Sequence, residues 1–103
     1  MKLTIEQIVK ACGGELLCGD PQGIVTGAKT DSRQIVPGDL FIPIKGERID
    51  AHMYIDSVLA SGAAASFTCY RPEALPACGA LILVDDTVSA LQKTAAYYRS
   101  LFT

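Results

Sequence analysis

The segment Leu40–Thr68, LFIPIKGERIDAHMYIDSVLASGAAASFT, decides the fold class. It opens with an apolar run, Leu40–Ile44, which is typical of a buried strand. Asp50 is a favourable N-cap for a helix that we expect to run to about Ser61, before Gly62 ends it. A second apolar run, Ala63–Thr68, predicts another strand. Two strands joined by a helix pair in parallel through a right-handed crossover, so the segment predicts an α/β fold.

Pro43 lies inside the first of these predicted strands. Proline has no backbone N–H to donate to a neighbouring strand, which places it at sheet edges or bulges. We therefore expect Leu40–Ile44 to be an edge strand or to contain a bulge.

The sequence before this segment predicts one short helix and two strands. Thr4 and Gln7 have the spacing of a capping box, with Thr4 as the N-cap. Gly13-Gly14 ends the helix, because glycine accepts the left-handed conformation of a helix stop. The strand candidates are Glu15–Cys18 and Ile24–Thr30.

The sequence after it predicts a strand and a long helix. Ala80–Val84 is apolar throughout, as in strands buried on both faces. Asp85-Asp86-Thr87 suits a helix start, where carboxylates complement the helix dipole. The predicted buried stripe of this helix is Val88, Leu91, Ala95, Tyr98 and Phe102. Together these elements predict one α/β domain, residues 1–103, with helices packed on a small mixed sheet of about four to six strands.

Composition excludes several classes of function. The 103 residues suit one domain, and half of them are apolar. A net charge of −2 argues against a nucleic-acid binder and against a polybasic membrane patch. No apolar run approaches the ~18 residues of a membrane span. The N-terminal MKLTIEQIVK carries charges where a signal peptide needs an apolar stretch, so we expect a cytoplasmic protein.

Metal sites find little support in the sequence. The four cysteines form no C-x-x-C pair and lie far along the chain from His52, the single histidine. We therefore expect no metal site and reduced thiols. The carboxylates of Asp85 and Asp86 could bind magnesium, but a helix start explains them without an ion.

Catalytic motifs are also missing from the sequence. There is no G-x-x-x-x-G-K-[ST], no G-x-G-x-x-G and no G-x-S-x-G. Ser32, His52 and Asp31 could be selected as a triad, but their spacing adds no support. We predict no catalytic residues in this chain.

A polar stretch after the Ile24–Thr30 strand candidate is better suited to binding. Thr30, Asp31 and Ser32 lie at the expected end of a strand, where ligands bind in open α/β sheets. Their hydroxyl and carboxyl groups, with the fork of Arg33, suit a phosphorylated, hydroxyl-rich ligand. A Pro37-Gly38-Asp39 turn leads into the next strand.

The charges of this stretch balance. The cations Lys29, Arg33, Lys45 and Arg48 equal in number the anions Asp31, Asp39, Glu47 and Asp50. Two interpretations remain open. The charges could pair with one another on the surface, or a few placed donors and backbone N–H groups could hold a phosphate without a strong field.

The order of these motifs resembles the N-terminal domain of the Mur ligases, which extend the peptide of the peptidoglycan precursor. The matching motifs are T-D-S-R (Thr30–Arg33), P-G-D-L-F (Pro37–Phe41), G-E-R-x-D-x-H (Gly46–His52) and G-A-x-A (Gly62–Ala65). The opening T-I-E-Q-I-V-K-A-C-G-G-E-L and the later V-D-D-T-V-S-A-L-Q-K-T-A-A-Y-Y-R resemble the type that adds D-alanyl-D-alanine. The type that adds the third residue is the alternative. A third possibility is a non-catalytic interaction domain that reuses the fold.

The resemblance implies a division of labour among three domains. The first binds the UDP end of UDP-N-acetylmuramoyl-peptide, the central one uses ATP and magnesium through a P-loop, and the third brings the amino acid or dipeptide. This chain resembles the first domain alone, so we expect no cofactor in it and no ligase activity from it. Its expected partners are the substrate and the central and C-terminal domains of the same protein, and we expect a monomer.

The resemblance also assigns site residues. Thr30 and Ser32 match positions that contact the uridine diphosphate, and Gly46, Glu47, Arg48 and Ile49 match a loop that lies against the nucleotide. Asp31 and Arg33 are included in the predicted site, mainly to hold its corner together.

Three further positions qualify the resemblance. His52 matches a polar residue at a helix start, for which a cap is the simpler role. Pro43 and Ala51 stand where relatives often have alanine and glycine, which affects the expected shape of the pocket.

Overall fold

The computed structural model describes residues 1–102. The α-helices are α1 (Ile5–Cys12), α2 (Ile55–Ala60) and α3 (Thr87–Ser100), and 3-10 turns lie at Ser32–Gln34 and Ala51–Tyr54. The strands are β1 (Leu3–Thr4), β2 (Glu15–Cys18), β3 (Ile24–Val25), β4 (Gly27–Lys29), β5 (Asp39–Phe41), β6 (Ala65–Thr68) and β7 (Ala80–Leu83).

The main sheet, within residues 1–102, has five strands in the order β2-β7-β6-β5-β4. β4, β5, β6 and β7 run parallel, and β2 is antiparallel to β7. The crossover from β5 through α2 to β6 therefore joins parallel strands, as predicted. The prediction of an α/β fold with a small mixed sheet is confirmed.

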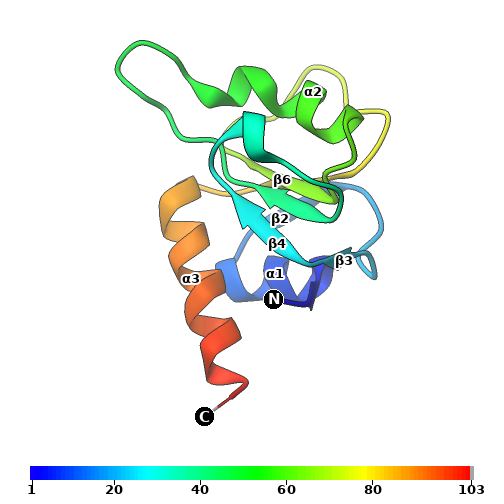
Figure 1. The fold of residues 1–103 in the computed structure, drawn as a ribbon, viewed down its shortest axis with the longest axis vertical. Helices are drawn as coiled ribbons and strands as arrows, with labels where there is room; N and C mark the ends of the chain where they lie inside the picture. The colour runs from blue at the N-terminus through cyan, green and yellow to red at the C-terminus, as the bar shows by residue number, and fades with distance from the viewer. Residues whose placement is uncertain (103) are drawn as a thin grey trace.

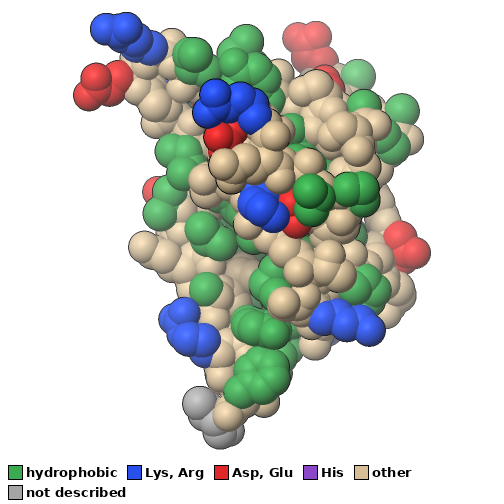
Figure 2. Space-filling model, in the orientation of Figure 1, with side chains coloured by type: hydrophobic (Ala, Val, Ile, Leu, Met, Phe, Trp, Pro, Cys, Tyr) green, Lys and Arg blue, Asp and Glu red, His purple; other side chains and the backbone are tan. Residues whose placement is uncertain are grey.

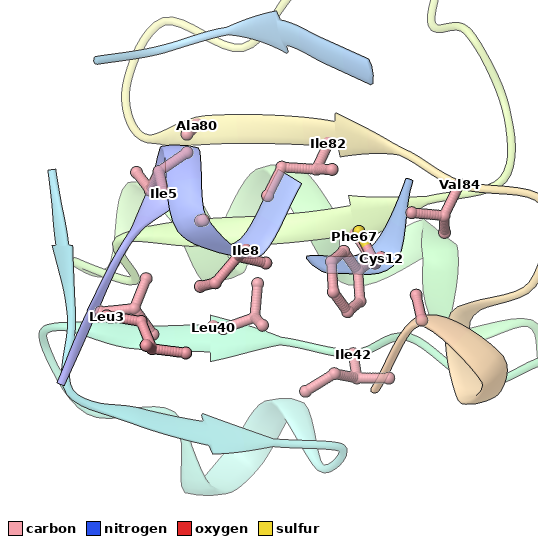
Figure 3. Packing of buried hydrophobic residues seen from close by; sticks show 13 residues of the cluster. Leu3, Ile5, Ile8, Cys12, Leu40, Ile42, Phe67, Ala80, Ile82 and Val84 are labelled. Carbon is pink, nitrogen blue, oxygen red and sulfur yellow. The ribbon is translucent and has the colours of Figure 1, made fainter. Parts of the chain in front are cut away.

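Helices cover both faces of this sheet (Figure 1). α1 and α3 pack on one face, and α2 lies on the other. Figure 3 shows Ile8 of α1 among the side chains of Leu40, Phe67 and Ile82 from the sheet, all fully buried. The second cluster packs Val58 and Leu59 of α2 against the other face; its remaining buried members are Phe41, Ile55, Ala63 and Leu81.

The start and end of α1 follow from local sequence. Thr4 Oγ1 accepts from the backbone N–H of Gln7 at 3.1 Å, and Gln7 Oε1 accepts from the backbone N–H of Thr4 at 2.8 Å. Gly13 then takes φ of 70°, the left-handed conformation that ends the helix. The predicted capping box is confirmed.

The single strand predicted over Ile24–Thr30 is wrong. β3 pairs with β1 in a separate antiparallel pair, and β4 pairs with β5 in the main sheet. The chain changes partners at Thr26, whose backbone N–H donates to Gly38 O. Pairing Val25 with Leu3 buries both side chains in the core, which explains the change of partner.

The prediction for Pro43 is also wrong. β5 ends at Phe41, so Pro43 follows the strand and no donor is lost from its pairing. β5 is an interior strand between β4 and β6. The register shift that the structure does contain lies in β2, between Leu16 and Cys18.

The predicted stripe of α3 is partly right, since Leu91 and Tyr98 pack against the core as half-buried side chains. Val88 and Phe102 are 41% and 73% exposed. The buried positions are Thr87, Ala90 and Thr94. Thr87 donates its hydroxyl to Pro43 O, and Thr94 donates to Ala90 O. Because both hydroxyls are satisfied, the threonines can be buried, and an apolar count alone misses them.

Candidate functional site

The loops that follow the parallel strands meet at one edge of the sheet. Carboxyl ends of parallel strands are the usual ligand-binding edge of open α/β sheets. The segment after β4 carries Thr30–Arg33, and the segment after β5 carries residues 42–50. In Figure 1 the second segment is the long green loop that projects away from the sheet.

A groove lies between these two segments. It has a volume of about 520 Å³ and is lined by Thr30, Asp31, Ser32, Arg33, Ile49, Ala51 and Tyr54. The structure thus brings Thr30–Arg33 together with Ile49, as expected for two edges of one site. Gly46, Glu47 and Arg48 do not line the groove; they form the exposed tip of the loop beside it.

Asp31 and Arg33 are bound to each other. Asp31 Oδ1 accepts from the Arg33 backbone N–H at 2.9 Å and from Nε at 3.1 Å, and Oδ2 accepts from an η-nitrogen at 3.0 Å. These hydrogen bonds from Arg33 lower the pKa of Asp31. The two side chains thus bind each other at this corner, and their roles in holding the site and in contacting a ligand stay predictions.

The hydroxyls of Thr30 and Ser32 are available for a ligand. In the described part of the chain neither side-chain oxygen has a hydrogen-bond partner. Thr30 is exposed, Ser32 is half-buried, and both line the groove. Each can therefore donate or accept without breaking a bond inside the protein.

The loop after β5 is a narrow hairpin. Lys45 and Asp50 form an antiparallel bridge, and the Gly46 N–H donates to Ile49 O at 2.9 Å. Across residues 1–102, Lys45, Glu47 and Arg48 make no ion pair. The surface-pairing interpretation is therefore wrong for this loop.

Nearer the sheet, Arg33 pairs with Asp31 on the surface at 3.0 Å, as that interpretation expects. Lys29 pairs with Asp39 at 3.0 Å, but the Asp39 side chain is 2% exposed, so this pair is partly buried. On the face shown in Figure 2, basic and acidic side chains are interspersed, so no patch of one sign forms there.

Asp39, expected from the sequence as a turn residue and as one of the balancing anions, is a buried carboxylate. It is 1% exposed, and its Oδ2 accepts from the Val36 backbone N–H and from Lys29 Nζ, each at 3.0 Å. Gly38 takes φ of 92° in the same turn. These contacts fix the turn that leads from the first edge of the groove into β5.

Two further residues line the groove: Tyr54, which was not expected from the sequence, and Ala51, which was expected only to affect the shape of the pocket. Asp50 Oδ1 accepts from the His52 backbone N–H and begins a 3-10 turn before α2. This turn places Tyr54 one turn beyond the cap, half-buried at the groove. The sequence did hold a sign of this role for Tyr54: it is an aromatic residue four positions after the N-cap Asp50, which adjoins the polar loop.

His52 is not the cap that was predicted, because Asp50 supplies it. Its ring instead contacts Cys69, the residue that directly follows β6. Nδ1 lies 2.6 Å from Asp50 Oδ1, and Nε2 accepts from the Cys69 backbone N–H at 3.1 Å.

Neither a metal cluster nor a membrane-spanning helix is present within residues 1–102. No group of three or more His, Cys, Asp or Glu side chains there could hold a metal ion. Asp86 accepts from the Ser89 N–H at 2.9 Å and so caps α3. No helix in this range is both long enough and apolar enough to cross a bilayer.

Comparison with known families places the chain. Residues 24–99 match the family described as "Mur ligase family, catalytic domain". The chain belongs to the Mur ligase family. It is 37% identical over 101 residues to the UDP-N-acetylmuramoyl-tripeptide–D-alanyl-D-alanine ligase of Bacillus subtilis, covering 95% of this chain and 22% of that protein.

Other Mur ligases show the same partial coverage. The chain is 31% identical over 96 residues to the UDP-N-acetylmuramoyl-L-alanyl-D-glutamate–2,6-diaminopimelate ligase of Phocaeicola vulgatus, covering 93% of this chain and 20% of that one. A crystal structure of MurF from Acinetobacter baumannii superposes with a TM-score of 0.82 at 32% sequence identity. The match covers 98% of this chain and 22% of the MurF chain. The chain thus has the fold of the MurF N-terminal domain and spans about a fifth of the length of these relatives.

Proposed function

We propose that this chain is the N-terminal domain of a ligase that joins D-alanyl-D-alanine to UDP-N-acetylmuramoyl-tripeptide, and that it binds the UDP-N-acetylmuramoyl part of that substrate. The observation that carries the proposal is the groove between Thr30–Arg33 and Ile49, which has two unpartnered hydroxyls at the carboxyl edge of the sheet. Family membership supports it, since the relatives' names include a UDP-N-acetylmuramoyl substrate.

The groove offers a separate contact for each part of a nucleotide. Tyr54 and Ile49 supply apolar surface on which a base can stack. The hydroxyls of Thr30 and Ser32 can bond ribose or phosphate oxygens. Lys45 and Arg48, unpaired in the described residues, can neutralise part of the diphosphate charge. Binding would depend on these placed groups, because the four cations from Lys29 to Asp50 are balanced by four anions.

The choice of D-alanyl-D-alanine over a single amino acid rests on the comparisons. The relatives from Bacillus subtilis and Treponema pallidum that bear the dipeptide name are 37% and 35% identical over 95% of this chain. Two diaminopimelate ligases are 31% and 29% identical. The diaminopimelate-adding type is therefore the second candidate. A cheap discriminator is the coding sequence after Thr103, whose downstream domains would resemble one type more closely.

In the complete enzyme this domain would contribute binding energy and not chemistry. ATP, magnesium and the incoming dipeptide would be handled by the central and C-terminal domains. The UDP end of the substrate lies far from the reacting carboxylate. Binding the UDP end nevertheless helps to position that carboxylate, so this remote binding can lower the barrier to amide formation.

The proposal can be tested by titrating the purified chain with UDP-N-acetylmuramoyl-tripeptide while recording amide NMR shifts. We expect shifts at Thr30–Ser32 and Gly46–Ile49, with weak affinity because the other domains also contact the substrate. UDP alone should move the same amides, and N-acetylmuramoyl-tripeptide without UDP should not. Shifts confined to other residues, or none at about millimolar ligand, would contradict the site.

A further inference from the structure

Three side chains form a cluster beside the groove: Asp50, His52 and Tyr70. His52 Nε2 accepts the Cys69 N–H at 3.1 Å, so the imidazole proton lies on Nδ1 and is donated to Asp50 Oδ1, 2.6 Å away. Tyr70 donates its hydroxyl to Asp50 Oδ2 at 3.0 Å. The His52 and Tyr70 rings also pack, with centroids 4.7 Å apart.

This cluster is buried at its centre and exposed at its edge. The His52 side chain is 9% exposed, whereas Tyr70 is 49% exposed. The His52 backbone N–H also donates to Asp50 Oδ1, and this bond is the main cause of the lowered pKa of Asp50. Both carboxylate oxygens therefore accept at least one hydrogen bond, which fixes the side chain of Asp50 in one orientation.

The cluster joins two segments that are distant in sequence. Asp50 is the last residue of the 45–50 hairpin and pairs with Lys45. Cys69 and Tyr70 directly follow β6. Residues 44–49 are exposed, and within the described residues the side chains of Glu47 and Arg48 form no ion pair that could hold the hairpin. The Asp50 carboxylate is thus the side-chain link from the hairpin to the sheet.

We propose that Asp50, His52 and Tyr70 are positioning residues that hold the Gly46–Ile49 hairpin at the groove in its binding-competent geometry. This inference rests on the proposed function, because it assigns the hairpin a role in substrate binding. A loop that is already ordered loses less conformational entropy when the ligand binds. Loosening the link should therefore weaken binding although none of the three residues lines the groove itself.

The test compares three variants of the chain. Tyr70→Phe removes only the hydroxyl that reaches Asp50 and leaves an exposed ring in place. His52→Phe keeps a ring of similar size but removes both ring hydrogen bonds. The matched control is Tyr97→Phe, which removes a hydroxyl that accepts from Gln7 on the opposite side of the sheet. Tyr70→Phe alone carries the test should His52→Phe not fold.

Two measurements follow. The first is made without ligand and records the NMR order parameters of the Gly46–Ile49 backbone. In the same samples, hydrogen exchange is followed at the Cys69 amide and, for comparison, at core amides such as that of Ile82. The second is the Kd for UDP-N-acetylmuramoyl-tripeptide from the titration. We expect both cluster variants to lower the order parameters and to raise Kd, Tyr70→Phe by up to about tenfold, the ceiling for one lost hydrogen bond, and His52→Phe by at least as much because it loses two. In His52→Phe the Cys69 amide should also exchange faster. Tyr97→Phe should change none of these.

Other outcomes separate the two proposals. If the order parameters of the hairpin are unchanged in Tyr70→Phe and His52→Phe, the positioning role is wrong. If the hairpin loosens but Kd stays the same, positioning for binding is wrong while the proposed function stands. If the unaltered chain binds no substrate, the proposed function fails, and the positioning role fails with it.

Discussion

Some polar side chains of the groove are hydrogen-bonded within the protein, and others are free to bond a ligand. Asp31 and Arg33 satisfy each other, whereas Thr30 and Ser32 have hydroxyls without a partner within residues 1–102. Burying a polar group against a ligand is favourable when it gains a bond, and these hydroxyls give up no protein bond to do so. At the residue scale the hydroxyls are therefore the better candidates for direct contact.

Replacing Ser32 with alanine in the full-length enzyme tests this assignment. We expect KM for UDP-N-acetylmuramoyl-tripeptide to rise about threefold to tenfold, because one hydrogen bond to the ligand is lost. Thermal stability should stay unchanged, since the deleted hydroxyl has no partner in the described part of the fold. Steady-state kinetics and a melting curve measure both. Ser61→Ala, which removes a hydroxyl that donates to Val58 O away from the groove, is the control. An unchanged KM in Ser32→Ala would count against the assignment.

At the scale of elements, short strands set the positions of the two edges. β4 ends at Lys29 and β5 at Phe41, so both loops leave the sheet at neighbouring points. The order of the sheet depends in turn on β7, which pairs with both β2 and β6. The turn after β2 must approach β7 closely, and Gly19 makes this approach possible. It takes φ of 104°, and a Cβ there would lie 2.5 Å from Ala80 Cα.

Gly19→Ala should therefore destabilise the chain in two ways. It places a side chain at positive φ, and it also brings the new Cβ against Ala80. Gly13→Ala is the matched control, because Gly13 also has positive φ but has open space around its missing side chain. We expect Gly19→Ala to lower the free energy of unfolding by at least about 1 kcal/mol more than Gly13→Ala. Urea unfolding of the two variants measures the difference. Equal losses would show that the close approach to Ala80 is relieved at little cost.

On the scale of the whole molecule, the sheet is enclosed by helices and its polar loops collect at one edge (Figure 1). The chain spans about a fifth of the length of its relatives, and its sequence has no P-loop. Under the proposed function, substrate binding and ATP chemistry are divided between this fold and other domains of the ligase.

The purified chain should consequently neither hydrolyse ATP nor join D-alanyl-D-alanine to UDP-N-acetylmuramoyl-tripeptide. Phosphate release and product formation, measured with magnesium present, should stay at the level of a protein-free blank. The full-length enzyme under the same conditions is the positive control. Turnover by the isolated chain that persists after repurification would contradict the division of roles.

Sequence alone was sufficient where structure depends on near neighbours. The capping box of Thr4 and Gln7 and the stop at Gly13 act within a few residues, so their pattern is visible in the chain. The crossover from β5 to β6 was likewise predictable, because two apolar strands around a helix have one favoured handedness. Motif order predicted that Thr30–Arg33 and the 46–49 loop form one site; of that loop, only Ile49 lines the groove.

Only the tertiary structure decided which distant groups meet. Val25 takes Leu3 as its partner, Thr87 is buried because Pro43 O accepts its hydroxyl, and His52 binds the backbone of Cys69. None of these contacts joins residues within one helix or one turn. Burial and hydrogen bonding at each position depend on the element packed against it, and local propensity does not contain that information. For this reason the sequence predicted that Thr30–Arg33 and Ile49 come together, while the contacts of His52 with Asp50 and Cys69 became visible only in the folded chain.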